Sequence, residues 1–534
     1  MVKKPKLILA SIATLALLLG GGMFTAVGAA ATAPSPTVSG PVGSAASPAL
    51  RDIPNSASSD KIQRRELAPK HTGSQKPRPG GGGGADGALQ TSATALLGTT
   101  DGLAFQGVGV GFGGYADCCA PPDTSLSVGD AASNQVVEWV NLDFAVFNKT
   151  TGALIAGPKP GNSVFANLSA GKCNTNNDGD PIVKFDHLHS RWILTQFSVT
   201  GGPPYYQCIA VSQTSDALGA YNTYAYSFGS NFNDYPKLGV FPDAYYMSFN
   251  LFANGRTFVG ADACAFDSAA MIAGGGSPSM VCFQQSSGGL LPADQDGNNA
   301  PPAGSGGYFM NFGTSTLNFN QLHFNPITPA SSTYTASASI AVAAFGQACS
   351  GGACIAQPGT TQKLDSLGDR LMYRLTYRND GTTQHLVVTH SVTGSGTAAP
   401  RWYELTAPSG STTYGLHQQS SYAPTTDYRW MGSAAMDKLG DIAIGYSESS
   451  GSRYPSIFYT GRQSGDPLNQ LRAERQIKAG TGSQLSNLAR WGDYSSLALD
   501  PADDCTFWYA NEYLIGSGTF NWSTWIASFK FPGC

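Results

Sequence analysis

Charged residues are scarce in this chain, and so is helical patterning. Lysine and arginine number 31 and aspartate and glutamate 35, so only 12% of the 534 residues carry a formal charge, against about 25% in an average soluble domain. Apolar residues rarely recur at the three- and four-residue spacing of an amphipathic helix. These two features exclude a helical bundle or coiled coil, and they disfavour a cytosolic enzyme.

Familiar catalytic motifs are also missing. The sequence has no Gly-x-Ser-x-Gly, no His-Glu-x-x-His and no phosphate-binding loop, so a serine esterase, a zinc metalloprotease and nucleotide chemistry lose their usual support. Beyond residue 100 there are 21 lysines and arginines against 31 acids. A chain with that acidic balance binds phosphate backbones poorly, so no nucleic-acid partner is expected.

The N-terminus indicates export. Lys3, Lys4 and Lys6 precede an apolar run over residues 7–19, and small residues follow at 27–31. This order predicts a secretory signal peptide over residues 1–30, with a membrane anchor as the alternative. No other apolar run is long enough to span a bilayer.

Ten cysteines all lie beyond residue 100. An even number of them in an exported chain favours disulfides over metal binding. Cys264–Cys282 and Cys349–Cys354 are the expected local pairs, and the terminal Cys534 suggests a pinned C-terminus. We therefore expect a secreted protein, extracellular or periplasmic.

Two regions follow the signal peptide. Residues 31–100 are rich in Pro, Gly, Ser and Ala and nearly lack aromatic residues, so they bury little apolar surface and are predicted to be a disordered linker or pro-segment. Residues 101–534 consist of short alternating apolar segments broken by Gly, Asn and Asp-Gly turns. That texture predicts an all-β domain.

Hairpin-like segments recur along residues 101–534. Each has an alternating strand, an acidic turn and a second apolar strand, and the turn acids of the four clearest copies are Asp186, Asp243, Asp437 and Asp500. Counting weaker copies, strands start near residues 124, 181, 237, 308, 369, 431 and 493. A spacing of about sixty residues predicts a β-propeller of seven four-stranded blades. Six blades plus an N-terminal extension is the alternative.

Three segments carry a family resemblance: residues 291–297 (LPADQDG), 364–378 (LDSLGDRLMYRLTYR) and 490–501 (RWGDYSSLALDP). Through them the chain resembles secreted bacterial β-propellers of the sialidase-like, neuraminidase-repeat superfamily. The sialidase Asp-box, Ser-x-Asp-x-Gly-x-Thr-Trp, has no intact copy here. The resemblance implies a carbohydrate-active propeller.

Loops that enter the inner strands of a propeller lie on one face, around a central funnel. Arginine occupies this phase in three successive predicted blades, followed by tryptophan in two of them. Sialidases use three arginines to hold a carboxylate because the planar guanidinium matches it bidentately. The predicted substrate-binding residues are therefore Arg370, Arg374, Arg429, Trp430, Arg490 and Trp491. The alternatives are ion pairs with nearby aspartates for the arginines and core packing for the tryptophans.

Acid–base candidates lie on the same predicted face. Asp180, Asp234 and Asp493 could supply the paired carboxylates of glycoside cleavage. Tyr494 is a candidate nucleophile, or the base of a polysaccharide lyase.

Two oxygen-rich turns could hold structural calcium. Asn174, Asn176 and Asp178 alternate like the first half of a calcium loop, and Asp294 and Asp296 form a second such turn. Polar turns without a metal are the alternative, and no catalytic cofactor is expected.

Two functions fit these observations. The first is a secreted glycoside hydrolase or polysaccharide lyase that acts on an anionic or complex glycan. The second is a non-catalytic extracellular propeller that binds glycan or protein. The expected partner is an extracellular glycan, and a monomer is expected.

Overall fold

The computed structural model describes residue 1 and residues 34–56, 65–66, 85–93, 95–116 and 119–534. The chain divides into Met1–Ala33 and the compact unit Pro34–Cys534, and the second is described here. Apart from its first residue, the predicted signal peptide lies outside the described residues. None of the helices in the described ranges is long and apolar enough to cross a membrane.

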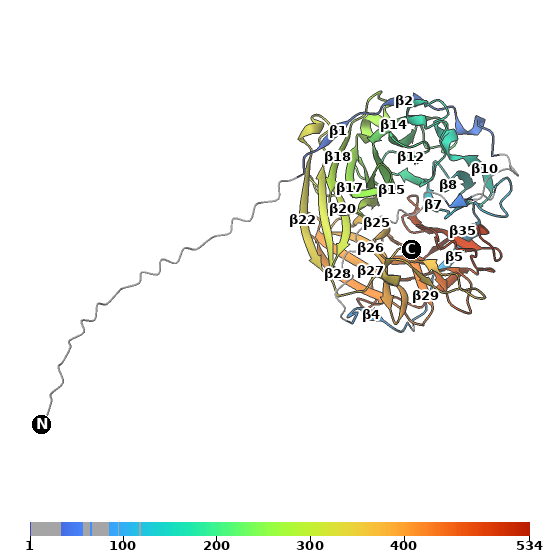
Figure 1. Cartoon of the computed structure of the whole chain (residues 1–534), viewed down its shortest axis with the longest axis vertical. Coiled ribbons are helices and arrows are strands. Elements are labelled where there is room, and N and C mark those ends of the chain that lie inside the picture. Colours follow the sequence, from blue (N-terminus) through green and yellow to red (C-terminus); the bar gives the residue numbers. More distant parts are fainter. Residues whose placement is uncertain (2–33, 57–64, 67–84, 94, 117–118) are drawn as a thin grey trace. The chain divides into compact units, whose positions relative to one another are not determined.

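Antiparallel groups of four strands follow one another along this unit (Figure 1). The first four groups are β7 (Ser125–Val128), β8 (Gln135–Val140), β9 (Asp143–Asn148) and β10 (Leu154–Pro160); β11 (Ile182–Asp186), β12 (Arg191–Ser198), β13 (Tyr205–Ser212) and β14 (Tyr221–Gly229); β15 (Asn231–Val240), β16 (Tyr245–Ala253), β17 (Thr257–Phe266) and β18 (Met280–Gln285); and β19 (Leu291–Asp296), β20 (Gly307–Gly313), β21 (Thr316–His323) and β22 (Thr333–Ala341).

The remaining groups continue the pattern. They are β25 (Met372–Asn379), β26 (Thr383–Gly394), β27 (Thr397–Pro408) and β28 (Gly415–Tyr422); β29 (Tyr428–Met436), β30 (Ile442–Ser449), β31 (Ser456–Arg462) and β32 (Arg475–Lys478); and β33 (Ser496–Leu499), β34 (Phe507–Leu514), β35 (Trp522–Lys530) and β5 (Thr100–Gln106). Within each group the spatial order follows the chain, except that β5 comes from the N-terminal side.

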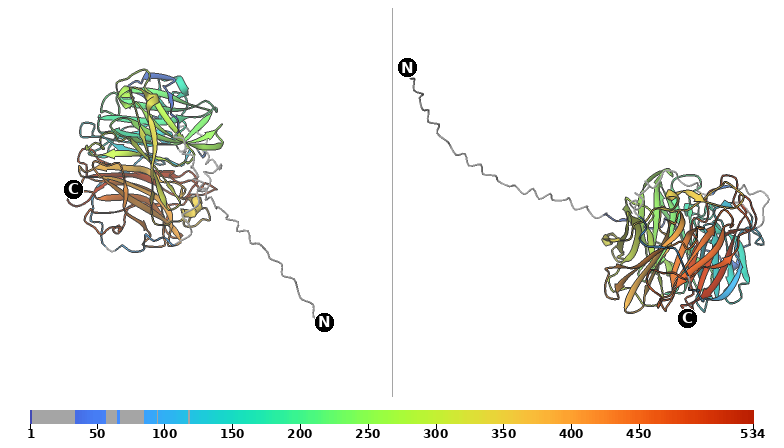
Figure 2. Two further views of the ribbon diagram at one scale, coloured as in Figure 1. Left: turned by 90° about the vertical axis from the view of Figure 1, so that its left-hand side faces the viewer. Right: turned by 90° about the horizontal axis from the view of Figure 1, so that it is seen from below.

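The first strands of the groups form a closed ring. Each contacts the first strand of the next group, from β7 through β11, β15, β19, β25, β29 and β33, and β33 contacts β7 again. A ring of antiparallel meanders around an axis is a β-propeller. The predicted all-β propeller is therefore confirmed (Figure 1; Figure 2).

The seven-blade count stays a prediction, because β19 and β25 pair in parallel and join two groups into one sheet. The predicted strand starts agree with the ring within a few residues except in two places. The strand predicted near residue 308 is β20, the second of its group, and β15 begins before residue 237. Proline and acidic residues in β19, which runs Leu-Pro-Ala-Asp-Gln-Asp, disguise the true first strand.

The N-terminal segment pairs with the outer edges of the propeller. β1 (Thr37–Ser39) pairs with β18, β2 (Gly43–Ala46) with β14, β4 (Leu89–Gln90) with β28, and β5 with β35. We call these four strands the edge belt. The described parts of the predicted disordered linker thus form strands, because edge pairing uses backbone hydrogen bonds and needs few apolar side chains.

Smaller elements connect these strands. Two short pairs are β3 (Arg65–Glu66) with β6 (Cys119–Ala120) and β23 (Ala353–Ile355) with β24 (Leu364–Asp365). The described helices are α1 (Ser268–Ile272) and the 3-10 turns Leu50–Asp52, Gly161–Phe165, Ala170–Lys172, Pro329–Ser331 and Ala348–Gly351.

The turns at the far ends of the first strands use aspartate as predicted. Asp186 accepts hydrogen bonds from the backbone of Leu188 and His189 at 3.0 and 3.1 Å. Asp437 accepts from Leu439 and Asp441 in the same way. Their carboxylates form the turns, as is typical of Asp.

The core lies between neighbouring sheets. β25 and β30 are buried at every position, because both faces of these sheets are covered by their neighbours. Four disulfides join described cysteines: Cys264–Cys282 and Cys349–Cys354, as predicted, together with Cys173–Cys208 and Cys505–Cys534. The last fixes the C-terminus, and the set is consistent with an extracellular protein.

Candidate functional site

Acidic residues lie where the chain enters the first strands of neighbouring groups. Asp123, Asp180 and Asp493 each stand two or three residues before β7, β11 and β33, and each has a positive φ, of 53°, 47° and 56°. Aspartate is one of the few side chains that tolerates this left-handed conformation. The shared conformation sends three entry loops to the same end of the ring.

These loops are joined by hydrogen bonds. The carboxyl groups of Asp123 and Asp180 hydrogen-bond to each other, and Asp180 Oδ2 accepts the backbone N–H of Tyr235 at 3.1 Å. The Tyr235 hydroxyl donates to the backbone oxygen of Asp493 at 3.3 Å. Three entry loops and β15 therefore form one polar centre, which we call the carboxylate cluster: Asp123, Asp180, Asp234 and Asp493.

The cluster holds protons that free carboxyl groups would lose. Burial, followed by repulsion from Asp180 and Asp493, raises the pKa of Asp123 well above its usual value. Burial and then Asp180 raise the pKa of Asp234 to about 7, although Arg370 and Arg490 oppose the shift. A carboxyl group that keeps its proton near neutral pH can act as a general acid.

Three cations lie among these acids. The Lys237 ammonium sits over the rings of Tyr235 and Tyr494, 3.5 and 4.0 Å from their centres. Burial lowers the pKa of Lys237 to about 8. Because this lysine is fully buried, it acts as an internal counter-charge beneath the cluster.

The two arginines are already paired. Arg370 contacts the carboxylate of Asp369 at 2.9 and 3.1 Å, and Arg490 pairs with Asp493. Neither arginine is therefore left unpaired for a substrate carboxylate. The lack of a free guanidinium disfavours the anionic substrate that the sequence predicts.

Access to the cluster is on the Asp369 side. The Asp369 side chain is 20% exposed and that of Asp493 12% exposed, and Asp234 is half-buried. Asp123 is covered. A ligand would thus meet Asp234, Asp369 and Arg370 first.

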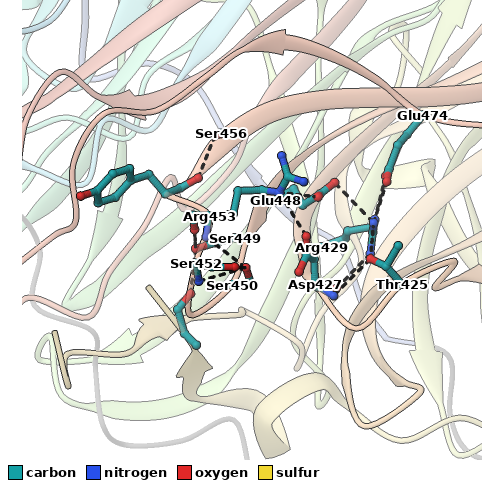
Figure 3. Close-up of polar contacts among 12 residues, drawn as sticks. Thr425, Asp427, Arg429, Glu448, Ser449, Ser450, Ser452, Arg453, Ser456 and Glu474 are labelled. Carbon is teal, nitrogen blue, oxygen red and sulfur yellow. Dashed lines mark hydrogen bonds and ion pairs between the residues drawn. The ribbon is translucent and has the colours of Figure 1, made fainter. Parts of the chain in front are cut away.

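Four predicted ligand-binding residues lie away from this centre. Arg374 is buried beyond Lys237 and pairs with Asp294 and Asp296 at 2.7 and 2.6 Å. Arg429 is buried in another ion-pair network, where Glu474 holds it at 2.6 and 2.7 Å (Figure 3). The alternative interpretation, ion pairing, describes both.

The two tryptophans are core residues. Trp430 and Trp491 are fully buried and pack against each other at 5.8 Å between ring centres. The Trp491 indole donates to Ser447 at 3.0 Å. Stacking on a sugar is excluded for both in this conformation, because no ring face is exposed.

Tyr494 lies in the cluster, but its hydroxyl is committed. It donates to the backbone oxygen of Pro181 at 3.0 Å, and burial raises its pKa well above the usual value. A phenol that keeps its proton is a poor nucleophile or base. Tyr494 therefore supports the site instead of performing chemistry.

The predicted calcium ligands already have other partners. Asp178 accepts the backbone N–H groups of Val199 and Thr200 at 2.6 and 2.8 Å, and the Asn176 amide donates to Ser198. Asn174 offers its backbone oxygen to Asn162. These contacts describe a polar turn, and calcium at this turn stays a prediction.

The second predicted calcium turn is an ion-pair site. Asp294 lies between Lys184 and Arg374, and Arg374 also holds Asp296. Within the described ranges, the one His/Cys/Asp/Glu group close enough to hold a metal is Asp262 with Cys264 and Cys282. Those cysteines form a disulfide, so their sulfurs are not metal ligands.

Sequence reasoning missed Asp123, Tyr235 and Lys237. Asp123 had a usable signal, because it precedes its strand as Asp180 and Asp493 precede theirs. Tyr235 and Lys237 had none, since they lie inside β15, where a register shift turns them toward the axis.

No family model matches the chain, and no curated protein matches it. Similar solved structures include the WD40 domain of SCAP from fission yeast, with 10% identity, 77% of this chain and 85% of that chain covered and a TM-score of 0.33. The Hadza microbial sialidase Hz136 has 11% identity, 76% and 64% coverage and a TM-score of 0.35.

The GH43 endo-arabinanase from Bacillus licheniformis has 10% identity, 67% and 96% coverage and a TM-score of 0.30. The chain thus resembles a sialidase and an arabinanase only at low identity. We assign the fold from the strand order above, and no activity from these similarities.

Proposed function

We propose that the protein is a glycoside hydrolase that acts on a neutral, complex glycan at the carboxylate cluster. The observation that supports this most is the raised pKa of Asp234, about 7, in a half-buried carboxyl beside Asp180 and Asp493. At neutral pH such a group still carries a proton to give to a leaving sugar oxygen.

Asp234 is the proposed general acid. The proposed second carboxyl group is Asp180 or Asp493. Asp180 accepts hydrogen bonds from Asp123 and from the backbone of Tyr235, and Asp493 is paired with Arg490. A carboxylate there would either activate water or attack the sugar carbon. Asp123 and Lys237 set the charge of this pair from beneath.

A neutral glycan fits the charge of the site. Arg370 and Arg490 each pair with an aspartate, so an added carboxylate would find no free guanidinium to bind it. Without such a partner, burying that carboxylate in the site would be costly.

The test is sugar release by the purified chain from neutral, amino-sugar and uronic-acid glycans, read by mass spectrometry. Asp234→Asn should lower kcat/KM on the best neutral glycan about 100-fold or more, the usual contribution of a general acid. Asp243→Asn is the matched control, because Asp243 is exposed at the other end of the same hairpin, and it should retain activity. Full activity in Asp234→Asn would refute the assignment.

A non-catalytic glycan-binding propeller is the second candidate. It is favoured by the burial of Arg374, Arg429, Trp430 and Trp491, which removes the predicted substrate contacts. Binding of a glycan without release of sugar, unchanged in Asp234→Asn, would support it against the hydrolase.

A further inference from the structure

A cavity lies at the end of the strands opposite the carboxylate cluster. It has a volume of about 220 Å³ and is bounded by the β25–β28 group on one side and by β29–β31 and the loop that follows on the other. Arg378, Lys438 and Arg462 all line it. None of them belongs to the proposed hydrolase site.

Arg462 is a buried cation without a carboxylate partner among the described residues. Arg462 is only 2% exposed. One guanidinium nitrogen donates to the backbone oxygen of Asp466 at 2.7 Å, and Nε is buried without a partner. The Asp466 carboxylate itself is held by Arg472 at 2.6 and 2.7 Å.

The other acids around this cavity are engaged elsewhere. Glu404 accepts from His385 Nδ1 at 2.7 Å and from Gln418. Asp380 accepts the backbone N–H groups of Thr382 and Thr383, both at 2.7 Å. Their closest contacts are therefore with these neighbours, and among the described residues neither forms an ion pair with Arg462.

Asp441 lies nearby but does not line the cavity. Its Oδ1 accepts the backbone N–H of Ser464 at 2.7 Å. Burial lowers the pKa of Arg462, although Glu404, Asp466 and Asp441 oppose the shift, and among the described residues no carboxylate pairs with the guanidinium directly. A buried charge in that state is costly until an anion reaches it.

The rim carries a second, accessible cation. Lys438 is exposed and donates to the backbone oxygen of Asp503 at 3.0 Å, with no carboxylate in an ion pair among the described residues. Arg378, by contrast, is held by Asp504. Lys438 and Arg462 thus mark the entrance and the floor of the same cavity.

We propose that this cavity binds a small organic carboxylate the size of a single sugar acid. The planar guanidinium of Arg462 pairs with the carboxylate, and Lys438 closes over it from the rim. A volume of about 220 Å³ is below the roughly 300–1,000 Å³ of pockets for drug-sized ligands, which favours one small molecule over a polymer. His417 is exposed on the wall and offers a hydrogen bond to a hydroxyl group.

The test is calorimetric titration of the full chain with glucuronate, with glucose as the uncharged match. We expect glucuronate to bind at least about tenfold more tightly than glucose, since only the acid gains a charge-assisted pair. Equal affinity for the two sugars would overturn the proposal.

Two variants locate the binding. Arg462→Gln should weaken glucuronate binding about 100-fold or more. If that variant does not fold, Lys438→Gln tests the proposal instead, because the Lys438 side chain is exposed and its replacement should not affect folding. Lys438→Gln should weaken glucuronate binding about fivefold, as for a surface charge. Lys363→Gln, an exposed lysine elsewhere, is the matched control, and equal loss in Lys363→Gln and Lys438→Gln would also overturn the assignment.

Discussion

The carboxyl groups of Asp123 and Asp180 hydrogen-bond to each other at the end of the ring where two neighbouring first strands begin. Two carboxyl groups approach this closely only when one of them keeps a proton. The pair therefore stores a proton in a buried position, next to Asp234, which is half-buried. The following predictions concern this centre and the contacts that hold the ring.

Activity should depend on the protonation of Asp234. Because its pKa is raised to about 7, kcat/KM should fall as the pH rises above about 7, where a general acid loses its proton. Lys237→Met removes a positive charge under the cluster and should move this limb to higher pH by about one unit. The measurement is the pH profile of kcat/KM for both proteins. A limb that does not move would show that Lys237 leaves the acid unaffected.

Stability should fall as the pH rises from about 4 to about 7. In the unfolded chain Asp234 loses its proton near the ordinary pKa of 3.8, whereas the folded protein keeps this proton until about pH 7. The folded state therefore binds more protons in this window, and the free energy of unfolding falls as the pH rises. Asp234→Asn should remove about 2 kcal/mol of this decline, roughly half the full linkage value for a partly solvated group. Urea unfolding of the parent and of Asp234→Asn at pH 4.5 and 7.5 measures the free energy of unfolding. An equal decline between the two pH values in both proteins would contradict the raised pKa.

The ion pairs of Figure 3 should contribute very unequally to stability. Arg429 is buried and is the cation that holds Glu474, so Arg429→Gln should cost about 3–5 kcal/mol by leaving a buried charge unpaired. Arg453 is 41% exposed where it meets Asp427 and Glu448, and Arg429 also lies within 3.5 Å of Glu448, so Arg453→Gln should cost no more than about 1 kcal/mol. Urea unfolding of both variants provides the comparison. Equal losses would mean that burial does not set the strength of this network.

Removal of β5 should destabilise the propeller. β5 is the outermost strand of the last group, and it covers the edge of β35 from Thr100 to Gln106. A chain that begins at residue 107 should unfold cooperatively at lower urea concentration or aggregate through the bare β35 edge. A chain that begins at residue 97 lacks the other three strands of the edge belt as well but keeps β5, so it should unfold at higher urea concentration than the chain that begins at residue 107. Indistinguishable unfolding of the two chains would show that closure by β5 is dispensable.

The sequence made the repeating hairpins visible because their turn acids and alternating strands depend on local chemistry. Asp186 and Asp437 form the predicted turns for that reason. The edge belt was hidden, since β1 and β2 are held through backbone pairing, and their side chains carry little apolar signal.

The site was predictable where position along a strand decides it. Asp180 and Asp493 precede first strands and Asp234 lies near the start of β15, so all three lie at the same end of the ring. The same reasoning predicted that Arg429 lies in this site, but Arg429 forms an ion pair with Glu474, which lies 45 residues further along the chain. Such long-range partners cannot be inferred from spacing alone.

The edge belt also constrains how the chain can reach its native state. Leu103 donates its backbone N–H to Ser528, 425 residues further along the chain, and β5 and β35 complete a single sheet. Synthesis proceeds from the N-terminus, so β5 is made early. Its partner β35 is available only after almost the entire polypeptide has been made. Contacts of this sequence separation carry a large loop-closure entropy and slow the folding step that forms them. The ring should therefore close last, after the middle groups have folded, and an arrested chain that lacks β35 would expose β5 to whatever strand it meets first.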